Sequence, residues 1–423
     1  MRLLLNGLIA LFTIMCLSLW QSAASLTQKD SYAIVIDAGS TGSRAFIFRF
    51  FLTDEGKRSI TSIKGMKCMP GLSSFSKSPP GDIVAYLLPT FLDAASIIPK
   101  SCHKSTKVYI KGTAGFRLLP EEEQLHIWNS LHHGLRSNRK VPFVIDKENL
   151  GTIDGYFEAY YAVLASNYVA GSVDGDLHRV EGKAMVGALD MGGSSTQLIF
   201  HTGTEPGQAI QNDDFWSHSW LNYGVERVRE RVWQNLVETH AISIALHSNS
   251  SGDTVAVVVS DNGEDLPLVA LDKIVTVIEN PCTFIGHEEE HSDDYSFIGT
   301  GSGQKCVEVI KQVIWPEGMC SSPPCAVDGI IHPPIDGAFY GMSVYYYGLD
   351  CIRHLGPNKL SWYVLLWITN VFFNLDSLSC WKLDFCIEMS STENNTNEKR
   401  NYDLECSLIL MFSFLGRIQA SMK

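Results

Sequence analysis

Short apolar runs separated by glycine- and serine-rich turns form the clearest pattern near the start of the chain. Residues 32–37 are an apolar run, residues 39–43 are mostly Gly, Ser and Thr, and residues 44–51 are a second run rich in Phe. Two apolar runs of strand length joined by such a turn are typical of a β-hairpin. The sequence therefore predicts a hairpin with a glycine loop at its tip.

Strands and helices then alternate. Residues 107–111 and 141–145 have the length and composition of strands. Pro120 and the three glutamates after it begin a predicted helix, because proline suits the first turn and acidic side chains favour the positive end of the helix dipole. Residues 151–167, rich in Ala and Tyr, form a second predicted helix. The first helix carries an apolar stripe at helical spacing, formed by Leu125, Trp128, Leu131 and Leu135.

The opening pattern recurs about one domain length later. Residues 185–190 are apolar, residues 192–195 form a Gly–Ser loop, and residues 196–200 are apolar again. Asp37 and Asp190 each end the first run of their unit, directly before the loop. Recurrence at this spacing predicts a duplicated α/β unit with a ligand between the two copies.

The patterns after residue 200 are weaker. Residues 220–237 have the spacing of an amphipathic helix, and residues 266–278 contain one or two apolar strands. Residues 339–347 are rich in Phe and Tyr, and we interpret most of these rings as core packing of a helix, with base stacking as the alternative. From residue 351 no periodicity connects the chain to the preceding body, and its apolar stretches are shorter than a membrane helix requires.

Composition places the chain among globular proteins. It has 423 residues, of which 45% are hydrophobic and 19% charged, so we expect two lobes. The net charge of −13 argues against nucleic acid as a partner, because binding to nucleic acid requires a basic face. A small anion is still compatible with it, since backbone N–H groups can hold a phosphate inside an acidic protein.

The N-terminal residues have the features of a secretory signal. Arg2 precedes an apolar run from Leu3 to Trp20, and small residues follow at 22–24. We predict a signal peptide over residues 1–24, with an uncleaved membrane anchor as the alternative. In either case the folded part faces the secretory lumen or the outside. The protein is then secreted, at the cell surface, or in the Golgi or another endomembrane lumen, and it contacts a membrane only if the segment is an anchor.

Cysteine usage agrees with an oxidising compartment. Four of the 11 cysteines lie within one short stretch, and we predict local disulfides among them, with a zinc site as the alternative. Asn249 and Asn394 begin N-glycosylation sequons. The clustered cysteines are Cys282, Cys306, Cys320 and Cys325.

The first glycine loop has the chemistry of a phosphate cradle. Gly39 and Gly42 allow the backbone to turn sharply and approach a phosphate, and Arg44 adds a charged fork suited to it. Asp37, at the end of a buried strand, is placed to hold a hydrated divalent cation. A plain hairpin turn is the alternative, but the second copy at Asp190 favours function. The loop hydroxyls are Ser40, Thr41 and Ser43.

A third glycine loop, residues 111–117, lies between a predicted strand and a predicted helix. A helix N-terminus at this position can bind an anion. A connection between a strand and a helix also often needs glycine for its turn alone. The sequence leaves both interpretations open.

These motifs, taken together, resemble those of a known family. Asp37–Arg44, Gly112–Arg117, Asp190–Gln197 and Phe339–Tyr347 occur in the order of the apyrase conserved regions, so the chain resembles the apyrase, or ecto-nucleoside triphosphate diphosphohydrolase, family. The resemblance implies an α/β fold of two actin-like (ribonuclease H-like) lobes with the active site in the cleft between them. It implies hydrolysis of nucleoside di- or triphosphates with Ca²⁺ or Mg²⁺, held largely through water by Asp37 and Asp190.

We expect the lobes to span residues 27–168 and 169–350, followed by a divergent tail over residues 351–423. The family's water-orienting residues match Ser195 and Gln197, and Tyr347 is a candidate for base stacking. The family's general base is a glutamate in a Gly-x-x-Glu-Gly motif, whose position Asp154 occupies here. Glu158, or no base at all, is the alternative. The family's phosphate contacts match Ser40, Thr41, Gly42, Ser43, Arg44, Thr113, Ala114, Gly192, Gly193 and Ser194.

The sequence thus predicts a hydrolase that removes the terminal phosphate of nucleotides by an activated water. Two alternatives remain. Phosphotransfer to a sugar would use the same lobes. A nucleotide-binding pseudoenzyme would follow if Asp154 cannot act as a base and the unusual tail impairs the fold.

Overall fold

The computed structural model describes residues 30–54, 56, 58–203, 207–248, 275–283, 285–314 and 320–347. The predictions of a signal peptide or anchor, the sequons at Asn249 and Asn394, and the tail from residue 351 lie outside these residues. Within them, no helix combines the length and apolar character needed to cross a bilayer. The chain divides into two compact units, one ending at Arg227 and completed by His332–Tyr347, the other spanning Val228–Ile331.

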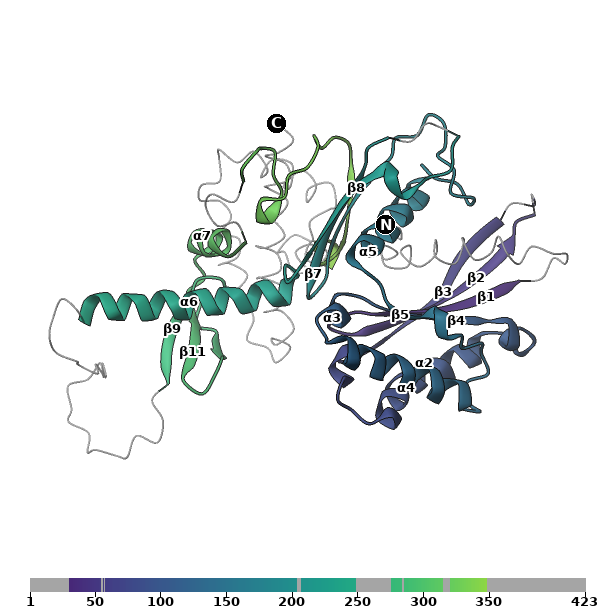
Figure 1. The fold of residues 1–423 in the computed structure, drawn as a ribbon, viewed down its shortest axis with the longest axis horizontal. Coiled ribbons are helices and arrows are strands. Elements are labelled where there is room, and N and C mark those ends of the chain that lie inside the picture. Colours follow the sequence, from purple (N-terminus) through teal and green to yellow (C-terminus); the bar gives the residue numbers. More distant parts are fainter. Residues whose placement is uncertain are drawn as a thin grey trace. The chain divides into compact units, whose positions relative to one another are not determined.

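The first unit begins with a five-stranded sheet in the order β3-β2-β1-β4-β5 (Figure 1). β1, β2 and β3 are antiparallel neighbours, whereas β4 and β5 run parallel to β1. The predicted hairpin and its glycine loop are therefore confirmed, and the order is that of a ribonuclease H-like sheet. The strands are β1 (Ser31–Ala38), β2 (Ser43–Leu52), β3 (Arg58–Cys68), β4 (Lys107–Gly112) and β5 (Leu150–Thr152).

The same unit contains a four-stranded sheet in the order β12-β6-β7-β8. β6, β7 and β8 are antiparallel neighbours, and β12 runs parallel to β6, so this sheet repeats the arrangement of β1, β2, β3 and β4. The predicted duplication is confirmed, and Asp37 and Asp190 occupy equivalent strand ends. The strands are β6 (Gly187–Met191), β7 (Ser195–His201), β8 (Phe215–Leu221) and β12 (Phe339–Ser343).

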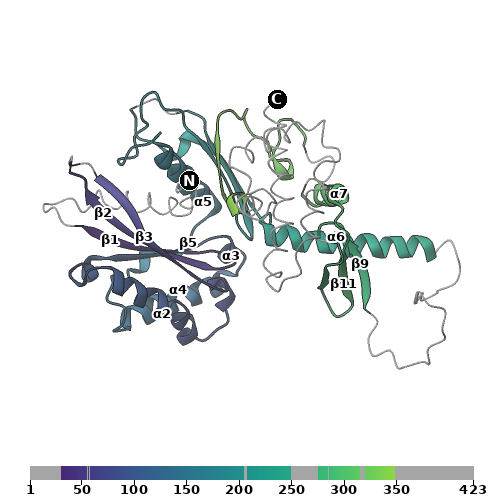
Figure 2. The ribbon, with the colours of Figure 1, turned by 180° about the vertical axis from the view of Figure 1, so that it is seen from behind.

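Helices cover both faces of the five-stranded sheet. α2 (Pro80–Ile97) and α4 (Glu121–Ser137) pack on one face (Figure 1), where Leu87, Phe91 and Leu131 join the alternate strand residues in a buried core. α5 (Gly155–Ala170) lies beside the four-stranded sheet in both views (Figures 1 and 2). Its small residues, such as Ala162, share a second core with β1, β2 and β6. Alternate residues of β1 therefore face different cores, as a period of two requires.

Several predicted elements differ from the structure. Residues 141–145 are alternately buried but form only the isolated bridge between Lys107 and Val144. Leu125 is 49% exposed, and Ile127 takes its place in the core. Trp220 lies in β8, which ends at Leu221, and the helix after it, α6 (Val225–Ser248), begins later than predicted. Residues 339–343 form a strand because they pair with β6, a tertiary contact that overrides local preference, whereas residues 344–347 are helical as predicted.

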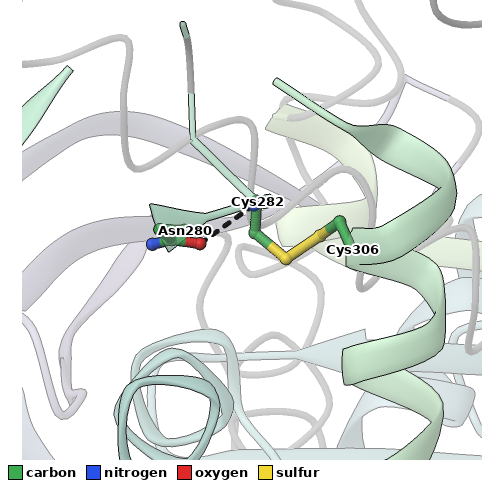
Figure 3. Close-up of a disulfide and its surroundings, with 3 residues drawn as sticks. All are labelled: Asn280, Cys282 and Cys306. Atoms are coloured by element: carbon green, nitrogen blue, oxygen red, sulfur yellow. Dashed lines mark hydrogen bonds between the residues drawn. A yellow bond between two sulfur atoms is a disulfide. The ribbon is translucent and has the colours of Figure 1, made fainter. Parts of the chain in front are cut away.

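The second unit contains most of α6, a three-stranded sheet and α7 (Gly303–Ile314) (Figure 2). The Trp233 ring of α6 stacks on Phe297 of the sheet at 6.2 Å between centroids. The predicted local disulfides are confirmed as Cys282–Cys306 and Cys320–Cys325. The former joins the end of β9 to α7, beside Asn280, whose side chain accepts a hydrogen bond from the Cys282 N–H (Figure 3). The strands are β9 (Thr276–Asn280), β10 (Glu288–Glu290) and β11 (Tyr295–Gly299).

Short helices complete the described elements. α3 (Ala114–Arg117) follows β4 directly. The others are the 3-10 helices Leu72–Phe75, Lys100–Ser105, Lys147–Asn149, Asn212–Asp214 and Val327–Gly329.

Candidate active site

The two predicted phosphate loops lie against each other within the first unit. The first connects β1 to β2, and the second connects β6 to β7. A Cβ atom added to Gly193 would lie 2.7 Å from Ser40 Oγ and 2.8 Å from Thr41 Cγ2. Only glycine permits this approach, so the structure brings the loops of the two copies together.

Further glycines support each loop from behind. A Cβ on Gly71 would lie 2.2 Å from the carbonyl oxygen of Ser40, and one on Gly115 would lie 2.8 Å from the Cα of Ser40. The second loop has a counterpart, because a Cβ on Gly224 would lie 2.4 Å from the backbone N of Ser194. Both loops are therefore held by neighbouring backbone that leaves no space for a side chain.

Asp37 and Asp190 are buried at this junction, 4% and 5% exposed. Burial raises the pKa of Asp37 to about 7, which Arg44 opposes and Asp190 reinforces. Burial also raises the pKa of Asp190, against a hydrogen bond from Ser343 and the charge of Arg44. Arg44 is the strand partner of Asp37. Two buried carboxylates that share one guanidinium have a deficit of positive charge.

The two aspartates fit a hydrated divalent cation. The Oδ1 atom of Asp190 is buried and has no hydrogen-bond partner, and burying an oxygen without a partner is costly. Hard cations prefer such oxygens. Within the described ranges, no group of three or more His, Cys, Asp and Glu side chains lies together as a metal site. Two carboxylates that contact the ion largely through water are compatible with that finding.

The other predicted phosphate ligands divide into two sets. Ser40 and Thr41 lie on the first loop where the second loop meets it. Ser43 differs, because its side chain is 2% exposed and its Oγ lies 3.2 Å from the hydroxyl of Tyr86 in α2. On a strand, adjacent side chains alternate, so the Ser43 hydroxyl lies on the face opposite to Arg44. The Ser43 hydroxyl therefore points toward Tyr86, and its contact with a phosphate stays a prediction.

The second motif and the remaining loop residues lie beside the strand ends. The Thr113 N–H donates to the carbonyl of Ala38 at 3.3 Å, so Thr113 and Ala114 begin α3 next to the first loop. Gly42 is the last residue of the first loop, and Gly192 is the first residue of the second loop. Ser194, also in the second loop, is buried, with 4% of its surface exposed. The structure thus gathers the predicted phosphate-binding segments at one junction.

The third motif differs most from expectation. Asp154 is exposed and caps α5, where its Oδ1 accepts a hydrogen bond from the Phe157 N–H at 2.8 Å. Glu158, one turn later, is 8% exposed. Its Oε2 accepts hydrogen bonds from Arg117 at 2.7 Å and from Gln197 at 3.3 Å. The expectation that Asp154 faces Ser195 and Gln197 is therefore corrected, because capping directs it to the helix backbone and Glu158 occupies the buried position.

Ser195 and Gln197 lie beside Glu158, at 1% exposure each. The side-chain amide nitrogen of Gln197 donates to Ser195 Oγ at 2.8 Å and to Ser219 Oγ at 2.9 Å. Burial raises the pKa of Glu158 to about 7, which Arg117 opposes and the charges of Asp190 and Asp37 reinforce. A carboxyl with a pKa near neutrality can accept a proton from water at physiological pH.

The side chains of Arg117 and Ser219 also contact this cluster. Sequence reasoning did not assign roles to Arg117 and Ser219. Arg117 is the last residue of the third glycine loop, and a charged residue in that position was a sequence signal for a role in the site. Ser219 lies in a strand without a motif, so the sequence contains no signal for it. Tyr347, the candidate for base stacking, is 48% exposed, and its ring contacts Tyr346 edge-on at 5.3 Å.

Sequence comparison relates the chain to nucleotide-hydrolysing proteins. The sequence model of the GDA1/CD39 (nucleoside phosphatase) family matches residues 23–363. A Golgi apyrase from Schizosaccharomyces pombe is 28% identical over 359 residues, which cover 77% of this chain and 56% of the relative. Ectonucleoside triphosphate diphosphohydrolase 1 from Mus musculus is 27% identical, over 84% of this chain and 69% of the relative. A guanosine-diphosphatase from S. pombe is 25% identical, over 74% and 55%.

The chain therefore spans little more than half the length of the two S. pombe relatives. Structure comparison finds a crystal structure of nucleoside triphosphate hydrolases from Neospora caninum, with a TM-score of 0.57 and 14% identity. That match covers 98% of this chain and 90% of the other. At this identity the likeness concerns the fold alone, and it agrees with the predicted α/β class.

Proposed function

The chain belongs to the GDA1/CD39 nucleoside phosphatase family, and from that premise we propose that it hydrolyses the terminal phosphate of nucleoside tri- or diphosphates. The observation that carries the proposal is the buried cluster of Glu158, Ser195 and Gln197 beside the two glycine loops. Phosphate-binding loops alone would suit binding or transfer. A buried carboxylate with hydrogen-bonding neighbours for a water favours hydrolysis.

In this mechanism Glu158, and not Asp154, is the general base. The water oxygen attacks the terminal phosphorus, the bond from phosphorus to the leaving nucleotide oxygen breaks, and Glu158 accepts the water proton. Ser195 and Gln197 orient the water through their hydroxyl and amide groups. Because a loose phosphoryl transition state needs little covalent assistance, positioning and electrostatics supply most of the rate enhancement.

Charge at the transferring phosphoryl group is offset by Arg44 and by backbone N–H groups of the two loops. Ser40, Thr41, Thr113 and Gly193 line the approach to them. Asp37 and Asp190 are the residues that would hold a divalent cation, Ca²⁺ or Mg²⁺. When bound, the ion would supply positive charge to the phosphate oxygens. The unpartnered Asp190 Oδ1 supports this assignment.

Nucleotide preference and location are proposed from the relatives. The names of the relatives include apyrase, guanosine-diphosphatase and triphosphate diphosphohydrolase. We therefore propose nucleoside triphosphates and diphosphates as the two substrate classes to compare. Two disulfides in the second unit agree with an oxidising compartment. We propose that the protein is located in the secretory pathway. The relatives are named Golgi apyrase and ectonucleoside triphosphate diphosphohydrolase, which supports the Golgi lumen and the cell surface equally.

The test compares two variants of the third motif. Phosphate release from ATP, ADP, UDP and GDP is measured with Ca²⁺, Mg²⁺ or a chelator. Glu158→Gln should lower kcat by about 10²–10⁴-fold, since it removes the base. Asp154→Asn keeps a capping side chain and should change kcat by less than about threefold, within the scatter of surface substitutions.

Each alternative predicts a different result. If Asp154→Asn is inactive and Glu158→Gln is active, the assignment of the base is wrong. Tight nucleotide binding with no turnover by the wild type would indicate a pseudoenzyme. Transfer of phosphate to added sugars at the expense of free phosphate would indicate a kinase.

A further inference from the structure

The guanidinium of Arg117 contacts two of the three groups that act on the attacking water in the proposed mechanism. Its Nη1 lies 2.7 Å from Glu158 Oε2, and its Nη2 donates to Ser195 Oγ at 3.2 Å. We propose that Arg117 is a positioning residue that fixes the Glu158 carboxylate and the Ser195 hydroxyl relative to each other. This inference rests on the proposed function, in which Glu158 is the base.

The side chain of Arg117 starts from a rigid position. Phe116 is fully buried and stacks on Trp128 with 4.4 Å between ring centroids. Gly115 contacts the backbone of Ser40 so closely that a Cβ could not fit. The N–H groups of Phe116 and Arg117 both donate to the carbonyl of Thr113. Since α3 is anchored on all these sides, the direction of the arginine is set by packing.

The guanidinium connects three segments. Nη1 also donates to the carbonyl of Ile153 at 3.2 Å, immediately before the cap of α5. One planar group thus joins α3 to the entry of α5, to Glu158 and, through Ser195, to β7. An arginine presents several donors in a fixed plane, whereas a lysine presents one point charge. Lysine could pair with Glu158 but could not keep all three contacts.

The ion pair is well shielded from solvent. The Arg117 and Glu158 side chains are 14% and 11% exposed. A carboxylate buried to this degree is costly unless a cation is hydrogen-bonded to it. The charged groups that face Glu158 are Arg117 from α3, Asp190 from β6 and Asp37 from β1, and Gln197 of β7 is a neutral donor. Arg117 is the cation in that set.

Two consequences distinguish positioning from a merely structural role. Without the guanidinium, Glu158 would lose the cation that is hydrogen-bonded to its carboxylate, so its pKa would rise, and the acid limb of the pH–rate profile would move to higher pH. A lysine would retain the charge, so the limb would stay near its original pH. The rate would still fall, because Ser195 and Ile153 would lose their contact.

The experiment measures kcat and KM for ATP with Mg²⁺ across the pH range in five proteins: wild type, Arg117→Met, Arg117→Lys, Glu158→Gln and Arg136→Met. Arg136 is an exposed arginine in the last turn of α4 and serves as the matched control. Circular dichroism melts check folding, and Arg117→Gln replaces Arg117→Met if the latter does not fold.

We expect Arg117→Met to lower kcat by about 10–100-fold with KM within about threefold, and to raise the acid limb by about one pH unit. Arg117→Lys should lower kcat with the limb unmoved, and Arg136→Met should match the wild type. If Arg117→Met keeps the wild-type kcat and the wild-type acid limb of the pH–rate profile, while Glu158→Gln is inactive, the inference about Arg117 is overturned. The proposed function would then remain intact. If neither Arg117→Met nor Arg117→Gln folds, a wild-type kcat in Arg117→Lys overturns the inference about Arg117. Full activity in Glu158→Gln, or none in the wild type, would overturn both.

Discussion

The side-chain amide of Gln197, which orients the water in the proposed mechanism, has three hydrogen-bond partners. Its nitrogen is shared among Ser195, Ser219 and Glu158 at 2.8, 2.9 and 3.3 Å. Ser219 is the strand partner of Gln197, on β8. If Ser219 holds the amide, Ser219→Ala should lower kcat by about 5–10-fold, the value of one lost hydrogen bond, with KM nearly constant. Steady-state kinetics on ATP measure both.

A matched control lies on the same strand. Ser217 pairs with Ile199, two residues from Ser219 and on the same face of β8. Ser217→Ala removes a hydroxyl without touching the Gln197 amide and should retain wild-type kcat. Equal losses in both variants would show that β8 as a whole, and not the contact to Gln197, is responsible.

At this scale the sequence predicted which loops meet, but it favoured Asp154, which the structure places at a helix cap, over the buried Glu158. The two loops were predicted from the residues of their hairpins, and the roles of Ser195 and Gln197 were expected from the family resemblance. Asp154 and Glu158 are one helical turn apart, and both positions can follow a glycine turn. The choice depends on where α5 begins, because a residue at the cap directs its carboxylate to the helix N–H groups. Helix boundaries are the feature that a single sequence defines least well.

The loops are positioned by their neighbours more than by their own residues. The Gly71 segment approaches the carbonyl of Ser40 where a Cβ would lie 2.2 Å away. Gly71→Ala should therefore displace the first loop, lower stability by about 1–3 kcal/mol and raise KM for ATP. Thermal melts and kinetics measure the two effects. Gly81→Ala in α2, where an added Cβ meets nothing within 4 Å, should be neutral or slightly stabilising. Equal destabilisation by both variants would contradict the argument.

Elements defined by local pattern were predicted, and those defined by pairing were not. The β1–β2 and β6–β7 hairpins each carry their own turn, and α4 carries its own start signal at Pro120. Residues 141–145 have a strand-like composition but lie beside β4 with one bridge. β12 is aromatic and was interpreted as helical, yet it completes the second sheet through β6. These outcomes depend on partners distant in sequence.

At the scale of the molecule, the duplication was the prediction with the widest consequence. It predicted two sheets of the same topology with an aspartate at the same strand end. It could not predict that both sheets share one compact unit, or that the chain between β8 and β12 contains a second. The lobe boundaries at residues 168 and 169 remain a proposal. An insertion between two strands leaves the repeated strand pattern unchanged. The repeated pattern therefore could not predict the unit inserted between β8 and β12.

Burial of acidic groups at the loop junction has a consequence for the whole protein. Asp37 has its pKa raised from 3.8 to about 7, and Glu158 from 4.5 to about 7, in both cases chiefly by burial. Between these values the folded state binds more protons than the unfolded chain, so the free energy of unfolding falls as pH rises. With chelator present, the melting temperature should therefore fall from about pH 5 to about pH 8. Asp37→Asn, which removes one of these carboxylates, should show a smaller fall.

A divalent cation should reverse this trend, because it binds the ionised aspartates of the folded state only. Mg²⁺ or Ca²⁺ should raise the melting temperature more at about pH 8 than at about pH 5, since protonated carboxyls do not bind the ion. The same titration on Asp37→Asn should give a smaller rise. A rise that is equal at both pH values, or equal in the variant, would place the ion away from Asp37 and Asp190, and the charge deficit at the loop junction would then need another partner.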